Sequence, residues 1–66
     1  MWKFKNPELF KIYNKNEVAK YLGISNVTLR GTVAGKINCS KKIAFMITKF
    51  LNSNAEIEDY FERIGE

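Results

Sequence analysis

The sequence predicts an all-α domain of five short helices with a helix-turn-helix at its centre, and three observations lead to this fold class. Apolar residues recur at helical spacing in several stretches of the 66-residue chain. Asparagine or serine stands before these stretches at the position of a helix cap, and glycine follows two of them. Because the connections are short and no repeat or Pro/Gly-rich linker divides the chain, we expect residues 1–66 to form one domain.

The N-terminal segment is predicted to be an extended arm followed by a short first helix. Trp2 and Phe4 alternate with lysines. We expect both rings to cover the core, because so small a domain needs the apolar area; a mobile arm that reaches a partner is the alternative. Asn6 is the candidate cap of the helix, and Pro7 takes its first position, where a missing N–H has no consequence.

The second and third helices are predicted to form a helix-turn-helix over about residues 15–34. Asn14 is the candidate cap of the first of these helices. A helix-turn-helix needs a small residue where its helices cross, a turn residue that tolerates positive φ, and an apolar anchor on the second helix. Ala19, Gly23 and Leu29 meet these three needs in order.

The third helix is expected over about residues 26–34, capped by Ser25 or Asn26 and stopped by Gly35. Gly31 inside this helix is unusual, because glycine costs about 1 kcal/mol relative to alanine in a helix interior. One explanation is a close approach of the backbone to DNA or to a partner protein. The other is that the helix is shortened or bent at this residue.

Two further helices complete the prediction. Ser40 is the candidate cap of a fourth helix over residues 41–51, which is apolar on nearly all sides. A fifth helix is expected over about residues 55–64. Its apolar stripe would consist of Ile57, Tyr60, Phe61 and Ile64.

Composition removes several functional classes. The chain has no histidine and only one cysteine, Cys39, so neither a disulfide nor a multi-cysteine metal site is expected. We therefore predict no enzyme activity, no metal and no cofactor, and no small-molecule ligand. The acidic residues near the C-terminus are interpreted as a solvated helix face. No apolar run resembles a signal peptide or a membrane span, and the single thiol favours a reduced, cytoplasmic setting.

Positive charge is concentrated in the first two thirds of the chain. Residues 1–42 contain nine Lys or Arg against Glu8 and Glu17, whereas residues 43–66 contain more acids than bases. The net charge of the whole chain is +4. A polarised domain of this kind favours a polyanion as partner, and double-stranded DNA fits that description.

The stretch Glu17–Lys36, "EVAKYLGISNVTLRGTVAGK", resembles the helix-turn-helix core of the Cro/lambda-repressor (XRE) family. The Gly35–Lys36 pair fits the family pattern without a gap, and the resemblance extends over roughly Asn14–Phe61. It implies a lambda-repressor-like DNA-binding domain with its recognition helix at about residues 26–34. It also implies a small transcriptional regulator, such as a repressor, of a phage or mobile-element switch.

The resemblance implies two groups of DNA-contacting residues. Asparagine can read adenine and arginine can read guanine through paired hydrogen bonds in the major groove. The residues expected to contact bases are Ser25, Asn26, Val27 and Arg30. The residues expected to contact phosphate are Lys15, Asn16, Lys36, Lys41 and Lys42.

A second hypothesis keeps the fold but replaces DNA with a protein partner. Gly31 stands where the family often has a polar, groove-facing side chain, which leaves fewer side chains for base readout. The chain would then be an antirepressor or modulator that binds a repressor, or an inhibitor of a host defence protein; a homodimer is also possible on either hypothesis. The contact residues on this hypothesis are Val27, Gly31, Phe45 and Met46.

Overall fold

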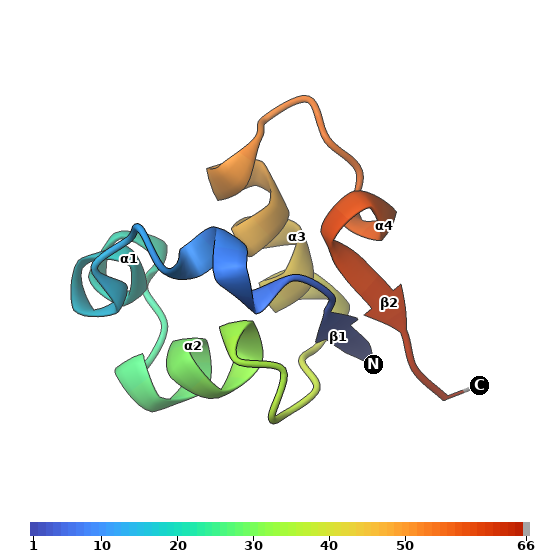
Figure 1. Cartoon of the computed structure of the whole chain (residues 1–66), viewed down its shortest axis with the longest axis horizontal. Helices are drawn as coiled ribbons and strands as arrows, with labels where there is room; N and C mark the ends of the chain where they lie inside the picture. Colours follow the sequence, from blue (N-terminus) through green and yellow to red (C-terminus); the bar gives the residue numbers. More distant parts are fainter. Residues whose placement is uncertain (66) are drawn as a thin grey trace.

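The computed structural model describes residues 1–65, which form mostly helix together with a small two-stranded antiparallel sheet. Figure 1 shows α1 and α2 packed beside each other at one end of the molecule and the two strands at the other. Within the described residues, no helix is both long and apolar enough to cross a membrane. The elements are β1 (Trp2–Phe4), the 3-10 helix η1 (Pro7–Phe10), α1 (Lys15–Leu22), α2 (Asn26–Val33), α3 (Lys41–Leu51), α4 (Ile57–Tyr60) and β2 (Phe61–Arg63).

The predicted helix-turn-helix is present, with the expected cap and turn. The side chain of Asn14 accepts a hydrogen bond from the backbone N–H of Glu17 at 3.2 Å. Gly23 has a φ of 75°, in the left-handed region where glycine is favoured. The Ala19 carbonyl accepts hydrogen bonds from the N–H groups of Gly23 (2.9 Å) and Ile24 (3.1 Å), so the end of α1 leaves few carbonyls unsatisfied.

The caps of the next two helices also follow the sequence. Ser25 caps α2 by accepting a hydrogen bond from the helix backbone at 3.0 Å, which decides between the two residues considered for this role. Ser40 caps α3 in the same way at 3.4 Å. Leu29 is fully buried, as its role as the anchor of α2 requires.

The prediction of an all-α domain of five helices is wrong at both ends of the chain. The expected first helix is a single 3-10 turn, and the expected fifth helix is one turn of α4 followed by β2. At Phe61 the backbone becomes extended, and this residue pairs with Phe4 of β1, with ring centroids 5.1 Å apart. The strand satisfies the edge of β1 and buries Phe61, so tertiary pairing overrides the helical spacing of the apolar residues.

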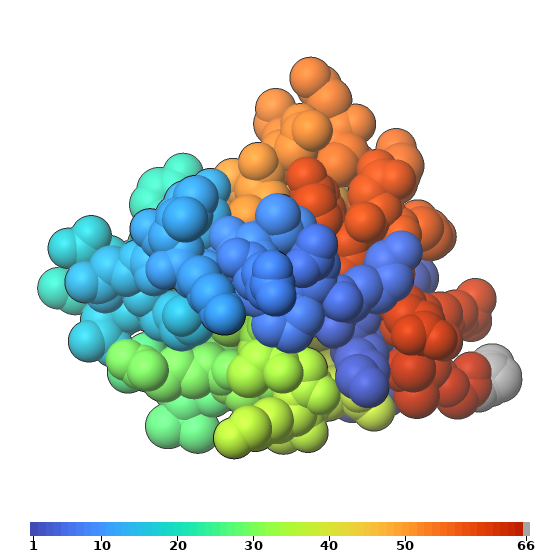
Figure 2. All heavy atoms as spheres, viewed as in Figure 1, coloured from blue at the N-terminus to red at the C-terminus, as the bar shows by residue number. Residues whose placement is uncertain are grey.

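The N-terminal arm covers the core, as expected. Trp2 and Phe4 are almost completely buried. The backbone N–H and carbonyl of Trp2 each bond to Cys39 at 2.8 Å, so β1 lies between β2 and the segment before α3. Phe4 also packs edge-on against Phe10, at 5.7 Å. Figure 2 shows the segment that follows β1 (blue) across the middle of this face, between α2 (green) and the orange and red C-terminal part.

Candidate nucleic-acid interface

The outer face of α2 presents the side chains that the sequence assigned to base contact. α2 continues without interruption to Val33, and Asn26, Val27 and Arg30 are exposed along it, Val27 to 80%. Ser25 is exposed too, but its hydroxyl donates a hydrogen bond to the Thr28 hydroxyl at 2.8 Å while it caps the helix. Its donor is therefore already used within the chain.

Arg30 connects the two helices of the helix-turn-helix. Its Nε donates a hydrogen bond to Oδ1 of Asn26 at 3.2 Å, one turn earlier on α2. Its Nη2 donates another to Oδ1 of Asn16 at 3.4 Å, near the start of α1. Because the guanidinium has five N–H donors, three remain free for a ligand. The two amides thus hold the guanidinium in place while part of it faces solvent.

Asn16 was expected to contact phosphate, and the structure joins it to a residue expected to contact a base. Sequence reasoning missed this link because the two residues are 14 positions apart. The only available signal was that both residues belong to one helix-turn-helix, whose first helix start lies beside its second helix. The network of Asn16, Asn26 and Arg30 is called the amide–arginine array below.

Two lysines flank the amide–arginine array. Lys15 and Lys36 line the same shallow depression as Arg30, whose apolar wall is formed by Val27, Gly31 and Ala34. The ammonium of Lys15 donates a hydrogen bond to the Phe10 carbonyl at 3.4 Å, which restrains it at the edge of this depression. Three cations therefore surround an exposed helix face.

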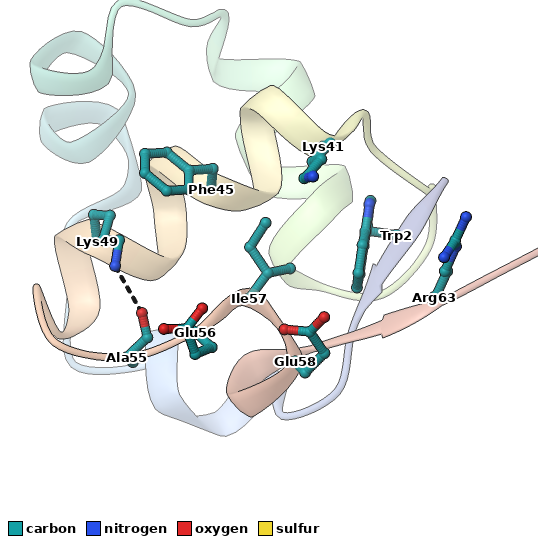
Figure 3. A pocket seen from close by; sticks show the side chains of 9 residues that line it. All are labelled: Trp2, Lys41, Phe45, Lys49, Ala55, Glu56, Ile57, Glu58 and Arg63. Atoms are coloured by element: carbon teal, nitrogen blue, oxygen red, sulfur yellow. Dashed lines mark hydrogen bonds between the residues drawn. The ribbon is translucent and has the colours of Figure 1, made fainter.

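The structure does not bring Lys41 to this depression. Lys41 lines a different hollow, together with Trp2 and Arg63 on one side and with Glu56 and Glu58 on another (Figure 3). Charges of both signs meet there. Lys42 is exposed at the start of α3 but lines neither depression described here.

Lys49 in the same hollow has a structural role. Its ammonium donates hydrogen bonds to the carbonyls of Ala55 (2.8 Å, drawn in Figure 3) and Ser53 (3.3 Å). It also lies over the ring of Phe45, 5.3 Å from the centroid. These contacts connect the C-terminal half of α3 to the loop that precedes α4.

Gly31 has a structural explanation that sequence reasoning missed. A Cβ atom at this position would lie 2.9 Å from Cδ1 and 3.0 Å from Cγ1 of Ile37, so the glycine makes room for that side chain. The carbonyl of Gly31 also accepts hydrogen bonds from the N–H groups of Lys36 (3.0 Å) and Ile37 (3.3 Å). The idea that α2 is shortened here is wrong, because the chain folds back over the helix only after Gly35, whose φ is 77°.

The residues predicted for protein contact lie on two separate surfaces. Val27 and Gly31 line the depression on α2. Phe45 and Met46 line a hollow between α3 and α1, and no residue is common to the two. Sequence reasoning missed Tyr21 in this second hollow, because it was assigned to the apolar side of α1, whereas it is 78% exposed.

Other chemistry within the described residues is limited. No group of three His, Cys, Asp or Glu side chains among residues 1–65 is arranged to hold a metal ion. Cys39 is buried, and burial raises the pKa of its thiol above the ordinary value. Comparison with models of protein families, with curated proteins and with solved structures finds no match to the chain.

Proposed function

We propose that this chain is a small, sequence-specific regulator of transcription that binds double-stranded DNA in the cytoplasm, as part of a phage or mobile-element switch. The amide–arginine array carries the proposal: three hydrogen-bonding side chains are held together on the exposed face of an uninterrupted helix. The resemblance to the Cro/lambda-repressor family supports α2 as the recognition helix.

Attraction to phosphate would supply most of the affinity. Lys15 and Lys36 stand at the edge of the helix face that carries Arg30. The N-terminus of α1 adds backbone N–H groups and the positive end of a helix dipole next to Lys15. Each phosphate neutralised releases counterions, so binding should weaken steeply as salt is raised.

Base readout would fall to Arg30 and Asn26. The free donors of the guanidinium can pair with O6 and N7 of guanine, the commonest specific contact in the major groove. The Nδ2 group of Asn26 can donate to adenine while its Oδ1 retains a lone pair beside Arg30. Val27 projects between them and can contact a thymine methyl.

The size of the chain favours two copies on one operator. Half-sites of helix-turn-helix dimers are spaced by about 34 Å, one turn of DNA. The chain measures 32 × 25 × 21 Å, so copies on successive major grooves would lie within contact distance of each other. A single module buries little area on DNA, and a second copy would double it.

The experiment selects duplexes from a random library and compares variants on the best duplex and on random DNA. Arg30→Ala should reduce discrimination by about 1–3 kcal/mol, roughly 5- to 150-fold, and keep the thermal midpoint. Arg63→Ala is the matched control, because Arg63 is exposed on β2 outside the proposed interface. Wild-type discrimination in the Arg30 variant, or no binding of any duplex at 50 mM salt, would contradict the proposal.

A second candidate function is the binding of a protein in place of DNA. The observation in its favour is Val27, an apolar side chain that is 80% exposed at the centre of the α2 face. An antirepressor or modulator would place this residue against a repressor, and an inhibitor would place it against a host defence protein. On this function random duplex is not bound even at low salt, and Val27→Asp abolishes binding of the protein partner.

A further inference from the structure

Aromatic side chains form a second exposed surface, between α1 and α3. Tyr21 is 78% exposed and Phe45 50% exposed, which is unusual for large apolar residues in so small a domain. The ring centroids of Tyr21 and Phe50 are 5.8 Å apart, and those of Tyr13 and Phe50 are 5.2 Å apart. The aromatic surface is defined here as Tyr13, Tyr21, Phe45, Met46 and Phe50.

The shape of the aromatic surface is that of a ridge between two hollows. Tyr21 and Phe50 line both hollows and therefore form the ridge that separates them. One hollow is bordered by Glu17 and the other by Lys49. The surface thus has an acidic end and a basic end.

We propose that the aromatic surface binds a second copy of this chain through a two-fold symmetric contact. In such a contact the same patch faces itself, so each end of the patch meets the opposite end of the other copy. The two-fold rotation places Glu17 of each copy against Lys49 of the other, and the Tyr21 side chain of each copy beside a hollow of the other. Both the charges and the relief are then complementary.

Charge complementarity is the argument for a second copy as the occupant. A chain with a net charge of +4 repels itself over most of its surface. The aromatic surface is an exception, since its two flanking charges are opposite in sign. It also shares no residue with the depression on α2, so self-association leaves the proposed DNA interface free.

The exposed area sets the strength of the contact. An aromatic side chain presents roughly 150–250 Å², so Tyr21, at 78% exposed, offers about 150 Å² and Phe45, at 50%, about 100 Å². The remaining members of the surface are partly buried and add less. The total is well below the roughly 800 Å² per partner of a standard stable interface. The dimer is therefore weak, with a dissociation constant of about 10 μM to 1 mM.

Sedimentation equilibrium of the DNA-free chain between about 10 μM and 1 mM tests the proposal. The wild type should pass from monomer to dimer over this range, whereas Tyr21→Ser and Phe45→Ser should remain monomeric while keeping their helical circular dichroism. Ile12→Ser is the control, since Ile12 is 83% exposed but lines neither hollow. Its dimerisation should match the wild type. Because no DNA is present, this outcome is independent of the proposed DNA binding.

A zero-length carbodiimide cross-link supplies a second readout that needs no substitution. In a mixture of unlabelled and ¹⁵N-labelled chains, Glu17 of one isotope should be joined to Lys49 of the other. A wild-type chain that stays monomeric at 1 mM overturns the proposal. So does a dimer that survives both serine substitutions, or one whose mixed-isotope cross-links exclude this pair. Loss of binding to some other protein in the Tyr21 variant, with a monomeric wild type, assigns the surface to that protein and also overturns it.

Discussion

Replacing Gly31 by alanine tests whether this glycine is present to accommodate Ile37. The substitution adds one methyl group to a helix interior, which in an open site stabilises the helix by about 1 kcal/mol. Here the new Cβ would lie 2.9 Å from Cδ1 and 3.0 Å from Cγ1 of Ile37, closer than carbon atoms normally approach. The side chain of Ile37 must therefore move.

The cost of that movement follows from the burial of Ile37, which is 45% exposed. Complete burial of an isoleucine side chain is worth about 1.5–3 kcal/mol, so the buried half contributes about 1 kcal/mol. Displacing it cancels most of the gain in helix propensity, and Gly31→Ala alone should change stability little. In an Ile37→Ala background the obstacle is absent, and the same substitution should stabilise by about 1 kcal/mol. The coupling between the two sites is then about 1 kcal/mol.

Urea unfolding of the four proteins in this double-mutant cycle, followed by circular dichroism, measures the coupling. In thermal unfolding the same difference corresponds to about 4–8 °C for a domain of this size. If Gly31→Ala stabilises equally in both backgrounds, Ile37 does not constrain this position. The glycine would then need an explanation from outside the chain, such as close approach of DNA or of a partner.

Two other predictions concern buried polar groups. The hydroxyls of Thr32 and Thr48 are fully buried and have no hydrogen-bond partner among the described residues; replacing either by valine should raise the free energy of unfolding by about 1 kcal/mol. Thr28→Val is the control and should give no gain, because its hydroxyl accepts a hydrogen bond at 2.8 Å. Burial raises the pKa of Cys39 above its ordinary value of 9.0, so at pH 8 the native thiol should react with a disulfide reagent far more slowly than the unfolded one. The folded chain holds this proton more tightly, so stability should fall as pH rises above 9.

The parts of the fold that the sequence predicts correctly depend on neighbouring residues. A cap acts on N–H groups two or three positions away, and a left-handed glycine ends a helix within one turn. Asn14, Gly23 and Ser40 therefore carry their structural roles in the local sequence, and the structure gives each of them that role. The same holds for α1, α2 and α3, whose starts match the prediction closely.

The parts that the sequence predicts wrongly depend on distant residues. Phe61 has helical spacing to its apolar neighbours, yet it is extended because β1 lies beside it. Nothing near residue 61 indicates that residues 2–4 form its partner strand. Tyr21 is a similar case, since helical periodicity placed it on the apolar side of α1, and only the position of α3 leaves it exposed beside Phe50.

The proposed site combines both kinds of information. Leu29 is fixed by local pattern and burial, and Arg30 follows it on the helix at a rotation of about 100°. With Leu29 fully buried, this rotation directs Arg30 to the edge of α2, where the start of α1 supplies Asn16. The identity of the readout residues is therefore visible in the sequence, but their organisation depends on the crossing of α1 and α2 at Ala19. An enlargement of Ala19 should loosen the contact between Asn16 and Arg30 and reduce DNA discrimination without altering either residue, which separates the effect of geometry from that of chemistry.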